Sequence, residues 1–536
     1  MSARPNTTQQ VFLVGDQRTD GVPIPAETGG NKGANLSRLA NLGLRVPPAI
    51  VLSTGFCQEY FERGGTFGPE FSRQLGGYLR RLEETTSLRL GGRQPLLVSV
   101  RSSPPASMPG MLDTVLNVGL TESTLRRVIR TTGNPTLVWD AYRRLVRSFA
   151  ETVHGASPDA FDQLTARYQL DGYVQSVQEL DPLELRGLAR DSADLLRALT
   201  GQPLPVDPLT QVVCAVEAVC QSWNSPRARA YRRLNGLEAM TATAVIIQAM
   251  VFGNAGGTSG SGVGFTRDPT NGEDRLYLDF LFNAQGEDVV SGRQGTSDAA
   301  RLSRVLPDVH AQLEEARRRL EFAFGDMQDF EFTIQEGRLY FLQTRAGKRT
   351  PWAALQIAVD LVSAGIIDSV TAVRRVTDIN LDAVERTRLE PEVGQVPIAT
   401  GIPAGLGVAV GTIAFDPERA QQMAADGPVI LVRSEITPSD ITGLAVAAGI
   451  LTRLGGRTSH AAVVARQLGK VCVVGCRALR LGHGSRQCSI GDRAFREGEL
   501  ITIDGETGHV YAGPVSVAIE KPREALATIA RWQQPA

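Results

Sequence analysis

The sequence predicts an α+β or α/β protein of several domains, and two observations carry this prediction. The chain has 536 residues, which at the usual domain size suggests roughly three to four domains. Segments with helical spacing alternate with short apolar runs typical of strands, and glycine, proline and aspartate separate them. Hydrophobic residues make up 42% of the chain and charged residues 21%, which is the composition of a folded protein rather than of a disordered one.

Changes in composition suggest the domain limits. Residues 1–349 mix strands and helices, and their part at about 121–204 is rich in Arg, Leu and Asp and is expected to be helical. Residues 350–397 are expected to form a helical bridge and linker, in which Pro391 and Pro397, with Pro403 just beyond, mark the linker. Residues 398–516 hold apolar runs divided by Gly and Asp, which predicts a compact β-rich domain with a helix. Residues 517–536 are too few for another domain and are expected to form a C-terminal tail.

The charge balance and the absence of targeting signals narrow the class of protein. The chain has 56 Lys+Arg and 57 Asp+Glu, so it has no general field for nucleic acid. Its apolar stretches are too short to span a bilayer, and the N-terminus lacks the apolar core of a signal peptide. Six cysteines without a CxxC pair argue against a disulfide framework or a zinc site. We therefore expect a cytoplasmic protein that binds neither nucleic acid nor membrane.

Three motifs in the first region could hold an anion. The segment GGNKGAN at residues 29–35 opens a predicted helix, whose free N–H groups and Lys32 suit a phosphate, although a capped surface helix explains it equally well. A strand at residues 96–101 ends in Arg101 before a Ser/Pro/Gly loop, which fits either a forked anion contact or an exposed strand end. Residues 253–264 contain six glycines, which allow close backbone approach to a polyphosphate or simply a flexible hairpin.

A predicted hairpin at residues 329–345 carries acidic side chains. Alternation places Asp329 and Glu331 on one strand face, and Gln343 and Arg345 share a face of the return strand. Two carboxylates so placed can hold Mg²⁺ between nucleotide phosphates, with Arg345 steadying the charge. A solvated strand face accounts for the same alternation.

His460 stands at the entrance of a predicted helix. The segment LGGRTSH precedes an apolar face at Ala461, Val464, Ala465 and Leu468, and Gly469 ends the helix. A phosphoryl group on the ring would meet the positive end of the helix. Histidine has an unperturbed pKa of about 6.5, so a neutral, nucleophilic ring is available at neutral pH. A histidine that merely packs against or caps the helix is the alternative.

The order and spelling of these motifs resemble the pyruvate, phosphate dikinase family. The resemblance covers nearly the whole chain, and it rests on segments such as GGNKGANLSRLANLGLRVPPAIVLST, VSVRSSPPASMPGMLDTVLNVGL, QAMVFGNAGGTSGSGVGFTRDP, DFEFTIQEGRLYFLQTRAGKRT and GILTRLGGRTSHAAVVARQLGKVCVVGC. It implies an ATP-grasp domain with a helical subdomain, followed by a swivelling β/β/α phosphohistidine domain. Smaller departures from the family are SerSerProPro before ASMPGM, and Arg457 beside the segment that holds the histidine.

The resemblance also implies roles for individual residues. The ATP phosphates would lie among the side chains that match the family's motifs, namely Lys32, Arg101, Glu331, Gln343 and Arg345. Asp329 and Glu331 would be the Mg²⁺ ligands, and Gln248 and Met250 would contact adenine. Arg144 would help to hold inorganic phosphate, and Thr458 matches a threonine through which some members are regulated.

The implied reaction uses ATP and phosphate. His460 would accept the β,γ-pyrophosphoryl group with release of AMP. Inorganic phosphate would then remove the terminal phosphoryl group as pyrophosphate, leaving phospho-His460. The family's pyruvate-binding (β/α)₈ barrel needs about 200 residues, and residues 517–536 are too few to form one. The phosphoryl group is therefore expected to pass to pyruvate on a separate barrel-domain protein, or to another small-molecule acceptor. A phosphotransferase for a different small molecule and a non-catalytic regulatory relic are the alternatives. The bridge at residues 350–395 is too short to hold the acceptor domain that a phosphotransferase for a different small molecule would need. A relic would have no reason to keep all of the motif residues together.

Overall fold

The structure of the chain is a computed structural model that describes residues 11–15, 23–106, 108, 111–174, 176–291, 299–390, 396–436, 440–457, 459–482 and 486–534. Within these ranges the side chains of Val290, Ser291, Ile441 and His460 are not described. Contacts group the chain into two compact units, Met1–Ala255 with Ile334–Thr344 and Gly256–Thr333 with Arg345–Ala536. The predicted first domain, residues 1–349, is thus divided between the two units. The limits of the functional domains stay predictions.

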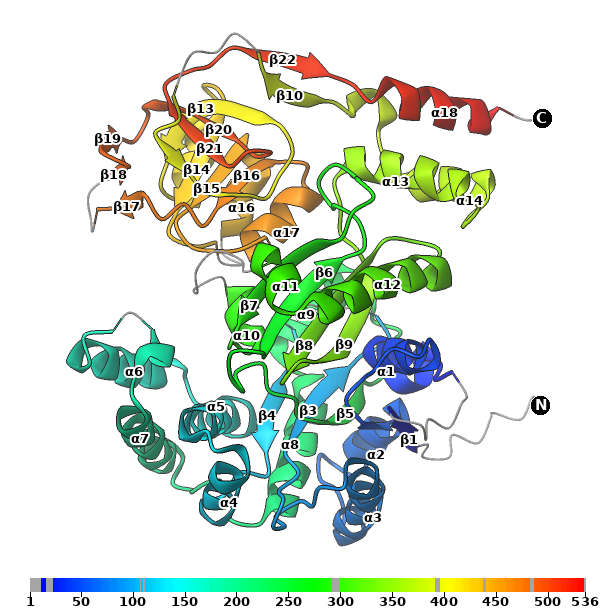
Figure 1. Ribbon diagram of the computed structural model, residues 1–536, viewed down its shortest axis with the longest axis vertical. Helices are drawn as coiled ribbons and strands as arrows, with labels where there is room; N and C mark the ends of the chain where they lie inside the picture. Colours follow the sequence, from blue (N-terminus) through cyan, green and yellow to red (C-terminus); the bar gives the residue numbers. More distant parts are fainter. Residues whose placement is uncertain are drawn as a thin grey trace. The chain divides into compact units, whose positions relative to one another are not determined.

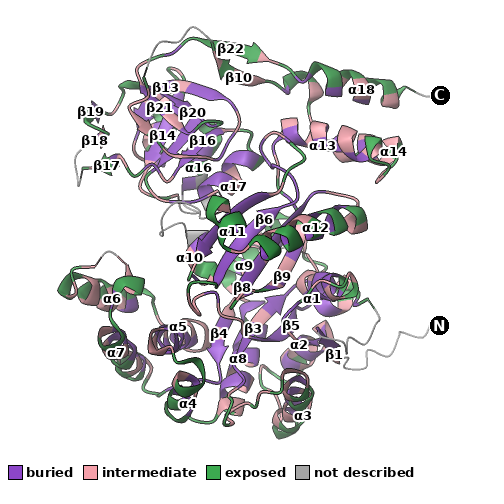
Figure 2. Cartoon of the chain, in the orientation of Figure 1, coloured by how far each residue is buried: buried purple, intermediate pink, exposed green. Residues whose placement is uncertain are grey.

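The first unit is built on a five-stranded sheet with the order β1-β2-β5-β3-β4 (Figure 1). Every neighbouring pair in it is antiparallel. The central strands are buried along their length, as the purple ribbons of Figure 2 show, because helices cover the apolar side chains. The strands are β1 (Val11–Val14), β2 (Ala49–Leu52), β3 (Val98–Ser103), β4 (Thr114–Val118) and β5 (Ala244–Ala249).

Helices supply the remainder of the first unit. Several begin at a polar residue whose side chain accepts a hydrogen bond from the first turn, as Thr121, Asn134, Asp181 and Asp207 do. The part expected to be helical, about 121–204, does hold successive helices. The helices of this unit are α1 (Ala26–Asn41), α2 (Thr54–Glu62), α3 (Pro69–Thr86), α4 (Glu122–Thr132), α5 (Pro135–His154), α6 (Asp159–Asp171), η1 (Val177–Glu179), α7 (Pro182–Thr200), α8 (Pro208–Ser222) and α9 (Pro226–Leu234).

A four-stranded sheet with the order β7-β6-β8-β9 begins the second unit. The predicted hairpin is confirmed as β8 and β9, which meet at a turn where Glu336 and Gly337 have φ values of 50° and 76°. The end of β8, the turn and most of β9, residues Ile334–Thr344, belong to the first compact unit. The elements are β6 (Gly260–Phe265), β7 (Tyr277–Phe282), α10 (Gly286–Ser291), α11 (Ala299–Val305), α12 (Pro307–Phe324), β8 (Gln328–Gln335) and β9 (Arg338–Ala346).

The glycine-rich segment at residues 253–264 is not a single loop. Gly260, Gly262 and Gly264 lie in the buried strand β6. A Cβ at Gly262 would stand 2.6 Å from the Phe332 ring, and those at Gly260 and Gly264 would meet Phe280 and Phe330 rings at 2.2 and 2.3 Å. These three glycines therefore make room for aromatic side chains of the neighbouring strands rather than for a phosphate.

An eight-stranded sheet with the order β11-β21-β20-β13-β14-β15-β16-β12 forms the second half of this unit. Strands β13 to β16 run parallel, and β20 is antiparallel to β13. One face packs against the three-stranded sheet β17-β18-β19, and the other packs against α15, α16 and α17. The layers are thus sheet, sheet and helices.

The elements of these layers follow the predicted apolar runs. The strands are β11 (Ala399–Thr400), β12 (Ile402–Pro403), β13 (Val408–Ala414), β14 (Val429–Arg433), β15 (Gly449–Thr452), β16 (Val471–Val474), β17 (Leu479–Leu481), β18 (Gln487–Ile490), β19 (Arg493–Arg496), β20 (Leu500–Asp504) and β21 (His509–Ala512). The helices are α15 (Pro417–Met423), α16 (Ile441–Val446) and α17 (His460–Gln467). Pro403 was expected in the linker, but it pairs with Val473 in the edge strand β12, where a residue without an N–H is tolerated.

Helices and a short ribbon flank this sheet in the sequence. Before it come α13 (Pro351–Ser363), α14 (Ser369–Val376), η2 (Leu381–Ala383) and β10 (Arg386–Leu389), and after it come β22 (Val517–Glu520) and α18 (Arg523–Gln533). Strand β10 pairs antiparallel with β22, so the segments entering and leaving the sheet lie side by side (Figure 1). The expected C-terminal tail is therefore a strand and a helix, and α18 packs against α13 and α14 through an apolar cluster that includes Leu355 and Ile529.

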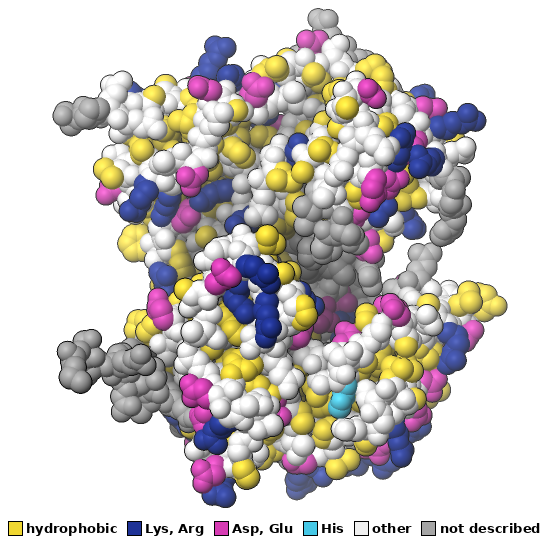
Figure 3. Space-filling view, turned by 180° about the vertical axis from the view of Figure 1, so that it is seen from behind, with side chains coloured by type: hydrophobic (Ala, Val, Ile, Leu, Met, Phe, Trp, Pro, Cys, Tyr) yellow, Lys and Arg dark blue, Asp and Glu magenta, His cyan; other side chains and the backbone are white. Residues whose placement is uncertain are grey.

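The surface carries charges of both signs. On the face shown in Figure 3, Lys and Arg side chains are interspersed with Asp and Glu, in keeping with a net charge of -1. Among the described residues, no helix is long and apolar enough to cross a membrane.

Candidate functional site

Lys32 lies in the first turn after a break in α1. Gly30 has φ 69° and ψ 167° inside the helix, so the regular part of α1 starts at the next residue. Two N–H groups of that turn already have acceptors, because Asn31 donates to a carbonyl just beyond β3 at 2.8 Å and Gly33 donates to Ser103 Oγ at 3.0 Å. The prediction of free N–H groups is wrong for these two residues, since the end of β3 folds against the helix.

Arg101 on β3 and Gln343 on β9 have side chains that the structure brings together. Arg101 Nη2 donates to Gln343 Oε1 at 3.5 Å, the outer limit of a hydrogen bond. Helix α1 joins the same place, because Asn35 Nδ2 donates to the carbonyl oxygen of Thr344 at 2.9 Å. Lys32 precedes Asn35 by about one turn on that helix. Lys32, Arg101 and Gln343 therefore come from three elements that are hydrogen-bonded to one another.

Gln248 and Met250 lie at the end of the central strand β5. Gln248 is 3% exposed, pairs with Ala49 on one side and Ser99 on the other, and donates from Nε2 to a backbone carbonyl at 3.1 Å. Met250 follows the strand, and its N–H donates to the carbonyl of Leu97 at 2.9 Å. The backbone of Gln248 is thus committed to the sheet, and the adenine contacts of both residues stay a prediction.

Arg144 belongs to a buried ionic cluster on α5. Asp140, which is 5% exposed, accepts hydrogen bonds from Arg143 Nη2 at 2.7 Å and from Arg144 Nε at 2.8 Å. Burial alone would raise the pKa of Asp140, but the charges of Arg144 and Arg143 outweigh burial and lower it to about 2. Asp140 was not among the predicted site residues, although its spacing of three and four residues from two arginines on a predicted helix was a signal.

The hairpin β8–β9 presents the acidic pair. Asp329 is 4% exposed and its Oδ2 accepts from Arg345 Nε at 2.8 Å, while Glu331 is half-buried. Burial raises the pKa of Asp329, against the opposing charge of Arg345. A solvated strand face therefore does not describe Asp329, which is buried and paired.

The donor set limits how these carboxylates could hold a metal. Among the described residues, no group of three or more His, Cys, Asp or Glu side chains lies close enough to hold an ion. Asp329 and Glu331 offer hard oxygen ligands two residues apart on one strand, which suits Mg²⁺ when phosphate oxygens and waters supply the remaining positions. The two residues fit a magnesium–nucleotide complex better than a metal cage made by the protein alone.

His460 is the first residue of α17. Ser459 is its N-cap and accepts a hydrogen bond from the N–H of Ala462 at 3.4 Å, so one of the two expected capping hydroxyls does cap the helix. Thr458, the other, lies outside the described residues, and nothing is described of the His460 side chain. The backbone places His460 at the positive end of the helix, as the sequence predicts.

Two arginines that flank this histidine hold the preceding loop. Arg466, which has no exposed surface, donates from Nη1 to the carbonyl of Arg457 at 2.9 Å. Its guanidinium lies 5.5 Å from the Phe265 ring centre, and that of Arg457 lies 4.7 Å from the Tyr277 ring centre. Burial raises the pKa of Tyr277 to about 12, so this phenol stays neutral. Arg457 was expected only as a departure from the family's sequence, and Arg466 was not among the predicted site residues.

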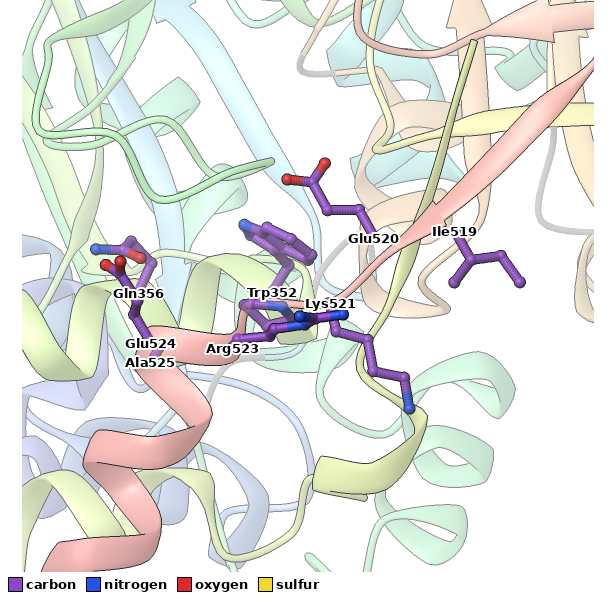
Figure 4. A pocket seen from close by; sticks show the side chains of 9 residues that line it. Trp352, Gln356, Ile519, Glu520, Lys521, Arg523, Glu524 and Ala525 are labelled. Carbon is purple, nitrogen blue, oxygen red and sulfur yellow. The ribbon is translucent and has the colours of Figure 1, made fainter. Parts of the chain in front are cut away.

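A cavity of about 600 Å³ lies elsewhere in the second unit, along α13, β22 and α18 (Figure 4). Its wall includes Trp352, Lys521, Arg523 and Glu524, and none of the predicted site residues. Positive and negative side chains balance there, and Glu520 is held by Arg386 at 2.9 Å. The balanced charges of this cavity give no reason to connect it with the predicted phosphate-binding residues.

Comparison with known proteins gives this arrangement a class. The family described as "Pyruvate phosphate dikinase, AMP/ATP-binding domain" matches residues 67–308, and "PEP-utilising enzyme, mobile domain" matches residues 425–508. The chain thus combines an AMP/ATP-binding domain with the mobile domain of PEP-utilising enzymes. It belongs to the pyruvate, phosphate dikinase family.

Similar proteins come from plants and bacteria. The chloroplastic pyruvate, phosphate dikinase of Flaveria pringlei is 41% identical over 530 residues, which is 98% of this chain and 55% of that protein. The pyruvate, phosphate dikinase of Clostridium symbiosum is 41% identical over 91% of this chain and 56% of its own length, and that of Rhizobium meliloti is 39% identical over 97% and 60%. The chain spans somewhat more than half the length of these curated relatives.

Proposed function

We propose that this chain is an ATP-dependent phosphotransferase in which a nucleotide-binding domain (residues 1–349) phosphorylates His460 of a swivelling domain (residues 398–516). One observation supports the proposal most strongly. Lys32, Arg101 and Gln343 come from three hydrogen-bonded elements of one unit, while His460 begins a helix in the segment that matches the mobile domain of PEP-utilising enzymes. The relatives are named pyruvate, phosphate dikinase, and the proposed reaction is of that kind.

The proposed first step forms a bond between His460 and the β-phosphorus of ATP. A neutral ring nitrogen attacks that phosphorus, the bond to the α,β-bridging oxygen breaks, and AMP leaves. Inorganic phosphate then attacks the terminal phosphorus, so that pyrophosphate leaves and phospho-His460 remains. The negative charge on the ATP phosphates requires cationic neighbours, which is the role proposed for Lys32, Arg101 and Arg345.

Other residues of the proposed site bind or orient the substrates. Asp329 and Glu331 would hold Mg²⁺, which supplies charge neutralisation on the phosphate oxygens when it is bound. Arg144, aimed by Asp140, would bind inorganic phosphate. Thr458 precedes the N-cap of α17, and its modification would place a charge beside the histidine.

A third step would transfer the phosphoryl group from His460 to an acceptor. We propose pyruvate bound to a separate barrel-domain protein, or another small molecule, as that acceptor. The N-terminus of α17 would stabilise the phosphoryl group on His460 until transfer, because backbone N–H groups and the helix dipole favour an anion there.

Labelled ATP tests the first step. The full chain is incubated with Mg²⁺, phosphate and ATP labelled on the β-phosphate, and AMP, pyrophosphate and protein-bound label are followed. Acid-labile label that is lost in His460→Ala and kept in His310→Ala, a control on helix α12, is the expected result. ADP as the nucleotide product, or equal labelling of both variants, would overturn the proposal.

A further inference from the structure

The hydroxyl of Ser103 joins the end of β3 to the start of helix α1. Ser103 is fully buried, and its Oγ donates to the carbonyl of Gly29 at 2.8 Å and accepts from the N–H of Gly33 at 3.0 Å. Its own N–H donates to Thr243 Oγ1 at 3.0 Å. One side chain thus supplies both an acceptor to the helix's first turn and a donor to the residue before the break at Gly30.

The chain around this hydroxyl is too close-packed to take another arrangement easily. A Cβ at Gly30 would lie 1.6 Å from the Ser103 carbonyl oxygen, and the φ of 69° there suits glycine. The N–H of Asn31 donates to the Pro104 carbonyl at 2.8 Å on the other side of Ser103. Helix α1 therefore begins at a site that β3 and its following residues define.

The two elements that Ser103 joins each carry a cationic side chain. Arg101 is two residues earlier on β3, so alternation puts it on the same strand face as Ser103. Lys32 lies between Asn31 and Gly33, both of which are hydrogen-bonded to residues 103–104. The Ser103 side chain therefore links the backbone on both sides of Gly30 to the strand that carries Arg101.

We propose that Ser103 is a positioning residue that fixes the spacing of Lys32 and Arg101 for a polyphosphate. The inference rests on the proposed nucleotide-binding function. Without the hydroxyl, the buried N–H of Gly33 and carbonyl of Gly29 lose their partner, and the helix start shifts to find others. Two cations preorganised at one distance bind the β- and γ-phosphates better than the same cations on elements that move independently.

Nucleotides that differ in phosphate number test this role. Dissociation constants for ATP and for AMP are measured by calorimetry in the His460→Ala background, so that ATP is not consumed. Ser103→Ala should weaken ATP binding about tenfold and AMP binding less than about twofold. The lost hydrogen bonds disturb the spacing of Lys32 and Arg101, and AMP has no β- and γ-phosphates for these cations to bind. The matched control is Ser102→Ala, because Ser102 is 2% exposed on the same strand and alternation puts its side chain on the opposite strand face from Ser103.

The ratio of the two dissociation constants decides between positioning and general stability. A fall in the preference for ATP over AMP in Ser103→Ala, with Ser102→Ala unchanged, supports the inference. Equal loss for both nucleotides, or no loss, overturns it. If Ser103→Ala does not fold, Ser103→Cys keeps the volume with a weaker donor and acceptor, and the same ratio applies. A parent protein that binds ATP no better than AMP would instead overturn the proposed nucleotide function.

The double variant Ser103→Ala with Lys32→Ala provides an independent check. If Ser103 acts through Lys32, the second substitution adds little to the ATP affinity already lost with Lys32→Ala, so the effects are strongly non-additive. Fully additive losses would show that Ser103 does not act through Lys32 and would overturn that part of the inference.

Discussion

Asp140→Asn should destabilise the first compact unit, because it removes the counter-charge of two arginines at once. Asp140 accepts from Arg143 at 2.7 Å and from Arg144 at 2.8 Å and is 5% exposed. Its pKa lies at about 2 instead of 3.8. A difference of roughly two pKa units corresponds to about 2–3 kcal/mol in favour of the ionised folded form. Breaking a buried pair by removing one partner costs about 3–5 kcal/mol, so we expect a loss of about 3 kcal/mol.

The sign of the pH dependence follows from the lowered pKa. The unfolded chain binds a proton at Asp140 more readily than the folded chain, so this contribution to the free energy of unfolding is complete above about pH 5 and is lost as the pH falls towards 2. The difference between parent and Asp140→Asn, measured by urea unfolding from pH 7 to pH 3, should shrink accordingly.

An exposed ion pair supplies the control for this measurement. Glu315 pairs with Arg319 at 3.0 Å, and the two side chains are 53% and 49% exposed. Glu315→Gln should change the free energy of unfolding by less than about 0.5 kcal/mol. A loss that small in Asp140→Asn, or a difference from the parent that stays constant from pH 7 to pH 3, would refute the reasoning.

Two further substitutions probe the second unit. Gly262→Ala should cost about 1–3 kcal/mol by overpacking, because its Cβ would lie 2.6 Å from the Phe332 ring, whereas Gly257→Ala, with nothing within 4 Å, should be near neutral in a thermal melt. Arg386→Met should accelerate proteolysis of the β10–β22 ribbon, because Arg386 contacts Glu520 at 2.9 Å and lies 4.6 Å from a tryptophan ring. Arg388→Met, at a residue 60% exposed, should leave that rate unchanged, and equal rates in both variants would contradict the assigned role.

Local patterns predicted the elements whose causes are local. The alternation around Asp329 and Glu331 gave the hairpin, and the apolar face after His460 gave α17, because periods of two and 3.6 residues are written in the sequence itself. The helix after Gly30 was predicted for the same reason, since glycine and the following apolar spacing lie within one short segment.

Features that depend on distant residues could not be predicted from those patterns. The glycines of β6 face rings such as Phe332 that come about 70 residues later in the chain, so their spacing alone fits a loop as well as a strand. The N–H of Gly33 is taken by Ser103, 70 residues away, which no helix pattern reveals. The pairing of Asp329 with Arg345 followed from the hairpin, but its burial depends on the surrounding packing.

The ribbon of β10 and β22 has a consequence for how this chain can be rearranged. Leu389 pairs with Val517, and paired strands place such residues about 5 Å apart. The segment between them, residues 390–516, therefore leaves the rest of the fold and returns to it at neighbouring positions. Such a segment can be removed and replaced by a short turn, or exchanged for the matching segment of a relative, without stretching the chain on either side. The segment that carries the histidine could therefore be exchanged as a unit, while the rest of the chain keeps its connections.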